Sequence, residues 1–164
     1  MNKTPIKTIG LKDLLLSNLT NPKFKLTENQ THWITNLIIR SPDMIDNIHV
    51  HLQPYQQKKI EIYEIAELVG IYSKTLCDKS NQLHMFDLNH IINIVSFIMD
   101  VLVCNKILIV NGTLSNEQIS KLVISCTSLL NISIVENVLS KTILDNFSYI
   151  YTDFIKVLTE PLDS

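Results

Sequence analysis

Three carboxylates follow one another at helical spacing near the middle of the chain. Glu61, Glu64 and Glu67 are three residues apart, so on a helix they lie on one face. Neighbouring carboxylates can serve as general acid and base when their environments separate their pKa values. Acidic residues in the first turn of a helix also complement its dipole. We expect this second role, a solvated acidic face.

The candidate metal ligands and nucleophiles are five histidines and three cysteines: His32, His49, His51, His84, His90, Cys77, Cys104 and Cys126. His49 and His51 are two residues apart, so on a helix they point away from each other and cannot share an ion. The cysteines form no C-x-x-C pair, which excludes a zinc ribbon and a thioredoxin motif. We expect no metal and no cofactor, with Cys126 as a small core residue.

The common catalytic signatures are missing from the chain. It contains no G-x-S-x-G, Walker loop, G-x-G-x-x-G or H-E-x-x-H sequence. Three glycines and one arginine are too few for a glycine-rich phosphate loop or a guanidinium clamp. No catalytic residue is predicted, and an enzyme whose site is assembled from distant residues stays open as an alternative.

One aromatic stripe lies near the C-terminus. Phe147, Tyr151 and Phe154 are four and three residues apart and would share a helical face. Core packing is one interpretation of this stripe. The other is an exposed edge that docks on a neighbouring protein, because aromatic residues are enriched in interface hot spots. These three residues are the candidate interface.

Apolar residues recur at helical spacing through most of the chain and predict an all-α fold. We expect one domain over residues 1–164, a bundle of six or seven helices with an arm at 1–9 and a tail at 161–164. Capping boxes at 27–30, 115–118 and 133–136 predict three helix starts; Ser41-Pro42 and Asp87 predict two more. Residues 78–82 are predicted to be a loop, and 106–110 either a helix end or one short β-strand.

Residues 88–110 form the most hydrophobic stretch of the chain. Asp100 lies near its middle, where a charge costs about 2.5–3.5 kcal/mol on insertion into a membrane. Asn93, Ser96 and Asp100 would share one helical face. These residues favour a central helix with one wet edge over a membrane span. The first twelve residues lack an apolar stretch, so no secretory signal is predicted.

The composition limits the classes of partner. The chain has 164 residues, 46 % of them hydrophobic, and a net charge of -2, which argues against disorder and against a nucleic-acid surface. It has 24 isoleucines and one alanine. Its helices must therefore depend on the burial of branched side chains more than on intrinsic propensity.

Residues 59–69, KIEIYEIAELV, place a basic residue and alternating apolar and acidic positions before an apolar helix. The segment resembles a pattern in small helical proteins of large double-stranded DNA viruses, the relatives of phycodnaviruses, iridoviruses and mimiviruses. Residues 89–102 and 117–130 look similar to the two helices that follow there, so the resemblance covers residues 42–130. Gln56-Gln57-Lys58 stands where that family has Asp-Gly.

The resemblance implies a virion structural protein, such as a minor capsid component that docks on other capsid subunits. Its location would be the virion or the host cytoplasm, and an oligomer is compatible with this role. The alternative is a helical inhibitor of host signalling or apoptosis, similar in size to viral Bcl-2-like proteins, with residues 87–130 as a central apolar hairpin. We expect a non-enzymatic protein–protein interaction module, and for the capsid role a contiguous exposed apolar patch.

Overall fold

The computed structural model describes the backbone of residues 8–137 and the side chains of residues 10–128. Six helices form this part of the chain: α1 (Thr8–Asn18), α2 (Glu28–Arg40), α3 (Asp43–Gln56), α4 (Ile62–Gln82), α5 (Leu88–Cys104) and α6 (Asn116–Asn137). Between residues 8 and 137 there is no β-strand, so the predicted all-α fold is confirmed. Because α1 begins at Thr8, the predicted arm at 1–9 extends two residues too far. The predicted tail at 161–164 lies outside the described residues.

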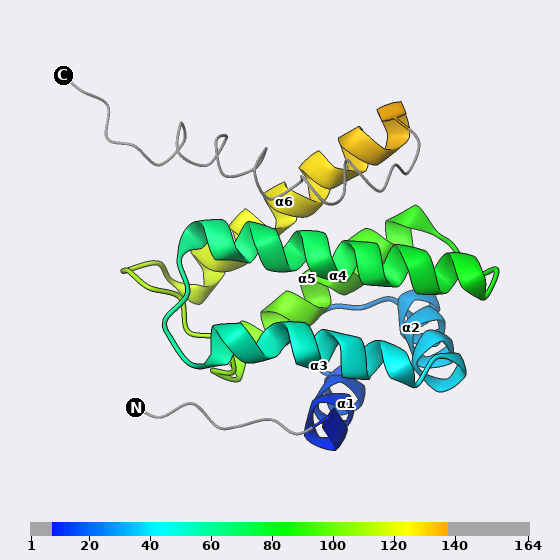
Figure 1. Ribbon diagram of the computed structural model, residues 1–164, viewed down its shortest axis with the longest axis horizontal. Helices are drawn as coiled ribbons and strands as arrows, with labels where there is room; N and C mark the ends of the chain where they lie inside the picture. Colours follow the sequence, from blue (N-terminus) through cyan, green and yellow to red (C-terminus); the bar gives the residue numbers. More distant parts are fainter. Residues whose placement is uncertain (1–7, 138–164) are drawn as a thin grey trace.

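Helix α5 is largely buried. It contacts α1, α2, α4 and α6, and in Figure 1 it runs behind α4, which lies between α3 and α6. Nine of its 17 residues are buried, and the apolar stripe of α4 packs against it. Helix propensity is weak in this alanine-poor chain, so shared burial of branched side chains holds these helices together. None of the helices described is long and apolar enough to cross a bilayer.

The predicted helix starts are confirmed where side chains cap them. Thr27 and Gln30 form a capping box at α2, with Gln30 N donating to Thr27 Oγ1 at 3.1 Å and Thr27 N to Gln30 Oε1 at 2.9 Å. Ser115 and Gln118 make the same pair at α6. At α5, Asp87 Oδ1 accepts from His90 N at 3.1 Å. Each pair satisfies backbone donors that the first turn leaves free.

Three local predictions are wrong. The Ser41 hydroxyl donates to the Asp43 carboxylate instead of capping α3. Residues 78–82 are not a loop but the last turn of α4, because Cys77 and Ser80 lie on its buried side. Ser133 starts no helix, since α6 continues through it to Asn137.

Two helices end on residues in the left-handed conformation. After α5, Lys106 has φ 59°, and Ile107 N donates to Leu102 O at 2.9 Å. After α4, His84 has φ 56°, and Met85 N donates to Ser80 O at 2.7 Å. Both ends are Schellman motifs, which usually carry glycine at this position.

Residues 106–110 begin as the end of α5, where Lys106 completes the Schellman motif, and they form no strand. Lys106 turns the chain, and Ile107 and Leu108 are buried in the core. The segment then meets the α3–α4 loop at one isolated parallel bridge between Ile60 and Val110. Ile60 N donates to Ile109 O at 2.8 Å, and Asn111 N donates to Ile60 O at 2.7 Å. The β-branched run that suggested a strand is therefore an extended connection with a single pairing.

Candidate functional site

The predicted carboxylate cluster lies where α3, the α3–α4 loop and α4 meet. Glu61 precedes α4 and is exposed, and Glu67 is half-buried on the second turn. Glu64, on the first turn, is only 4 % exposed. The expectation of a solvated acidic face is therefore wrong for Glu64. Its carboxylate contacts two residues of the α3–α4 loop, Lys58 and Glu61.

Each carboxylate has a partner that the sequence analysis did not identify. Lys58 Nζ lies 2.8 Å from Glu64 Oε2, and Glu61 N donates to Glu64 Oε1 at 2.9 Å. The Tyr55 hydroxyl donates to Glu67 Oε2 at 2.8 Å. Asn111 Nδ2 donates to Glu61 Oε1 at 2.9 Å. We call this set the corner network: Tyr55, Lys58, Glu61, Glu64, Glu67 and Asn111.

Two members of the corner network, Tyr55 and Lys58, have shifted pKa values. Burial, and then the hydrogen bond to Glu67, raises the pKa of Tyr55 well above its ordinary value. The hydrogen bond to Glu64 raises the pKa of Lys58. Both shifts move the groups further from neutral pH, whereas a general acid or base needs a pKa near the working pH. The corner network thus holds fixed hydrogen bonds and joins the α3–α4 loop to residue 111.

The histidines do not converge. His32, His51 and His84 are exposed. His49 is buried, with Nε2 at 3.2 Å from Gln53 Nε2, so the prediction that His49 and His51 point apart is confirmed. His90 lies beside Trp33, with ring centroids 5.8 Å apart. Within residues 10–128, no three His, Cys, Asp or Glu side chains gather in a way that could hold a metal ion.

The cysteines are mostly buried. Cys126 lies in the core, as predicted, and Cys77 is buried in the same hydrophobic cluster. Burial raises the pKa of the Cys77 thiol to about 12. A nucleophilic cysteine needs a lowered pKa to form its thiolate, so Cys77 acts as a packing residue.

The predicted wet edge of α5 faces α6. The Ser96 and Thr127 hydroxyl oxygens are 3.5 Å apart. Burial raises the pKa of the Asp100 carboxyl, while a hydrogen bond from Ser120 acts in the opposite direction. Asn93, at the other end of the edge, is exposed. The edge thus forms a polar seam between two helices.

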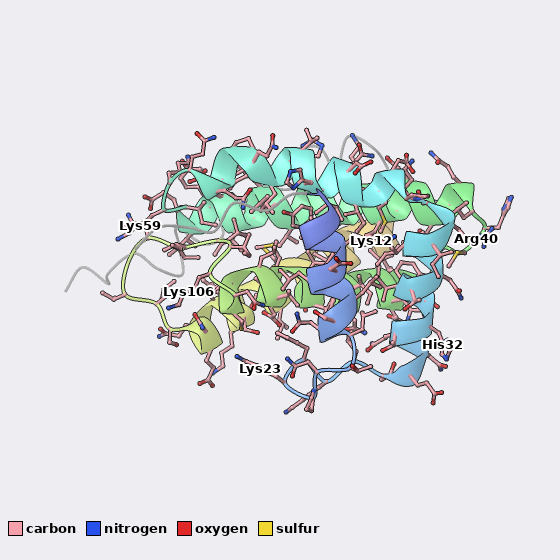
Figure 2. The ribbon with its side chains drawn as sticks, turned by 90° about the horizontal axis from the view of Figure 1, so that it is seen from below. Lys12, Lys23, His32, Arg40, Lys59 and Lys106 are labelled. Carbon is pink, nitrogen blue, oxygen red and sulfur yellow. The ribbon has the colours of Figure 1, made fainter. Side chains whose placement is uncertain are left out.

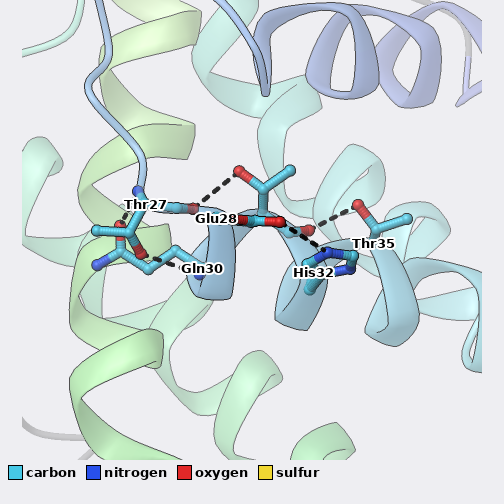
Figure 3. A network of polar contacts seen from close by, with 6 residues as sticks. Thr27, Glu28, Gln30, His32 and Thr35 are labelled. Atoms are coloured by element: carbon cyan, nitrogen blue, oxygen red, sulfur yellow. Dashed lines mark hydrogen bonds and ion pairs between the residues drawn. The ribbon is translucent and has the colours of Figure 1, made fainter.

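A groove of about 250 Å³ lies between the turn after α1 and the start of α2. Its apolar lining comes from Leu19, Pro22 and Leu26, and its polar lining includes Lys25, Glu28 and His32. Figure 3 shows the α2 side of it, where Glu28 Oε1 lies 3.9 Å from His32 Nε2 next to the Thr27 capping box. The sequence analysis missed this groove. The Asn21-Pro22 pair favours a bend in the chain, but it gives no indication of a groove.

Three large branched side chains are mostly exposed. Ile39 on α2 is 67 % exposed, Val50 on α3 is 60 % and Ile124 on α6 is 52 %. The candidate interface residues Phe147, Tyr151 and Phe154 lie outside the described residues. The contiguous apolar patch therefore stays a prediction.

Together, the fold and these sites define an all-α helical bundle in which the clustered carboxylates join the α3–α4 loop to α4 and to Asn111. Comparison with protein families, with characterised proteins and with solved structures finds no match. The functional argument accordingly rests on the residues of this chain.

Proposed function

We propose that the protein is a non-enzymatic protein–protein interaction module. The observation that carries the proposal is the exposure of Ile39, Val50 and Ile124 on three different helices. A β-branched residue loses side-chain freedom in a helix, and one that stays exposed gains no burial in return. Contact with another protein would supply that burial.

The corner network supports the non-enzymatic part of the proposal. It contains the densest group of carboxylates that the sequence offers for acid–base chemistry. In the fold, these carboxylates accept hydrogen bonds from Tyr55, from Asn111 and from a backbone amide, and one pairs with Lys58. These contacts give the cluster a structural task.

In its finer form, the proposal is a virion structural protein, a minor capsid component that docks on other capsid subunits in the virion or the host cytoplasm. The support is the resemblance of residues 59–69, 89–102 and 117–130 to small helical proteins of large DNA viruses. These segments correspond to the start of α4, to α5 and to α6, three helices that contact one another. They thus belong to one packed unit.

A second candidate function is the Bcl-2-like inhibitor of host signalling or apoptosis. The observation that favours it is the buried helix α5, paired with α6 and contacted by α1, α2 and α4. An inhibitor of this class would bind an amphipathic helix through its apolar face. Binding of such a helical peptide, with no association with particles, would favour this candidate over the capsid role.

The test is quantitative mass spectrometry of intact particles purified from the native source. We expect the chain at a constant ratio to the major shell component. A variant with three exposed changes, Ile39→Gln, Val50→Gln and Ile124→Gln, should stay folded, because glutamine is a good helix former, and should be lost from the particles.

The matched control carries glutamine at exposed polar positions of the same helices, Asn36→Gln, Asn47→Gln and Ser125→Gln. It should enter particles like the unmodified chain. Absence of the chain from particles would refute the capsid role. Equal incorporation of the two variants would refute the use of these aliphatic residues.

A further inference from the structure

The groove beside α2 is held in shape by contacts on both of its sides. On the loop side, Asn21 Oδ1 accepts from Lys23 N at 3.0 Å, and the Phe24 ring packs edge-on against Phe97 of α5 at 5.6 Å. On the helix side, the Thr27 capping box fixes the first turn of α2. A groove that is already formed requires little ordering when a partner binds.

The size of the groove indicates the kind of occupant. Its volume of about 250 Å³ is below the ~300–1,000 Å³ that pockets for small-molecule ligands usually have. A space of this size takes one or two side chains. Leu19, Pro22 and Leu26 provide apolar contacts for an aliphatic group.

Lys25 gives the groove its charge preference. It lines the groove and has no ion-pair partner among residues 10–128, and Lys23 extends from the same loop (Figure 2). Lys25 also has a φ of 52°, a conformation that glycine or asparagine adopts with less strain. Asparagine would be less strained here and is common in this chain, with 15 copies. The position nevertheless carries a lysine, which places a long cationic side chain at the groove.

The rim is not uniformly basic. Glu28 lies on it beside His32, and the whole chain has a net charge of -2. A continuous polyanion, such as a lipid headgroup layer or a nucleic acid, would meet Glu28 as well as Lys25. A single carboxylate on a protein partner can pair with Lys25 and avoid Glu28.

We propose that this groove seats a segment of a protein partner in which an aliphatic side chain stands next to a carboxylate. The aliphatic group packs against Leu19 and Leu26, and the carboxylate pairs with Lys25. The inference rests on the proposed interaction function and specifies the chemistry of the partner segment.

The test uses the full chain labelled with ¹⁵N and a short synthetic peptide with a central Glu-Leu pair, capped at both ends. We expect the peptide to shift the amide resonances of residues 19–32 and to leave those of α4 unchanged. Free glutamate and vesicles that contain phosphatidylserine are titrated in parallel. Shifts of the same amides by either of these, equal to those by the peptide, would overturn the proposal.

Two glycine variants form a matched pair. Lys25→Gly and Lys106→Gly each remove one positive charge and relieve one left-handed backbone, so both should fold at least as well as the parent chain. Only Lys25→Gly should weaken binding of the peptide. The expected loss of affinity is about two- to fivefold, which corresponds to the free energy of an exposed charge pair. Equal affinities for the two variants would overturn the role of Lys25. A third variant, Thr20→Trp, fills the groove from an exposed position and should abolish the shifts; retained shifts would place the peptide elsewhere.

The peptide test of the groove and the particle test of the proposed function can fail independently. If the chain is found in particles but the peptide shifts no groove amide, the groove inference fails alone. If the peptide binds as expected and the chain is absent from particles, the capsid role fails alone.

Discussion

Glycine at the left-handed ends of α4 and α5 should stabilise the protein. Lys106 closes the Schellman motif of α5, with Lys106 N donating to Val103 O at 3.1 Å and Ile107 N to Leu102 O. A residue with a Cβ at positive φ crowds the following carbonyl, which costs about 1–2 kcal/mol. Glycine avoids this crowding but loses about 0.5–1 kcal/mol more conformational entropy on folding.

The difference between these terms predicts a gain of about 0.5–1 kcal/mol in the free energy of unfolding for Lys106→Gly. The same gain is expected for His84→Gly at φ 56°. The two sites are the ends of different helices, so the double variant should show the sum. For a chain of this size, each kcal/mol corresponds to about 2–4 °C in Tm.

Urea denaturation followed by circular dichroism measures the effect. Lys106→Ala is the matched control, because it removes the same charge near the C-terminus of α5 and keeps the Cβ. Asp78→Gly, at an exposed position inside α4, should show no such gain and instead lose about 0.3 kcal/mol, because glycine is only slightly poorer than aspartate as a helix former. The reasoning is refuted if Lys106→Gly is no more stable than Lys106→Ala.

Three further changes test the buried polar groups and the caps. The Tyr72 hydroxyl is fully buried and has no hydrogen-bond partner among the described residues, so Tyr72→Phe should raise the free energy of unfolding by about 1 kcal/mol in urea denaturation; a loss of stability would contradict this. The pKa of Asp100 is raised in the folded state, so the folded protein holds this proton more tightly than the unfolded chain does. As the pH rises above the ordinary pKa of aspartate, this difference lowers the stability of the folded state. Asp100→Asn should therefore stabilise the protein at neutral pH and change little in acid, and the opposite pH dependence in melting curves would refute the assignment. Thr27→Ala should cost about 0.5–2 kcal/mol in the same denaturation assay, whereas Asn29→Ala, exposed on the same turn, should change stability less.

The partners of the carboxylate cluster show where sequence reasoning stops. Glu61, Glu64 and Glu67 were recognisable from their spacing, but the burial of Glu64 depends on Lys58 and on the α3–α4 loop. Asn111, 50 residues further along the sequence, donates a hydrogen bond to Glu61 and holds that loop in place. Helical periodicity does not specify which distant segment returns to a given loop, so the corner network could not be predicted.

The helix ends also separate features that the sequence predicts from features that it does not. The capping boxes at Thr27 and Ser115 formed as predicted, because their donors and acceptors are three residues apart. The similar pattern at Ser133 lies inside α6, since a serine followed by glutamate three residues later fits a helix interior as well. The groove at Lys25 depends on Phe24 reaching Phe97, a contact with no local signal.

The amino-acid sequence by itself determined the helical class, the apolar faces and the ends that carry their own caps, because these depend on spacings of one to two turns. Tertiary structure alone decided which polar groups are buried and paired, the course of residues 106–110 and the groove beside α2. Those features depend on contacts between segments far apart in the chain, and the free energy of such contacts is set by the packing of the whole bundle.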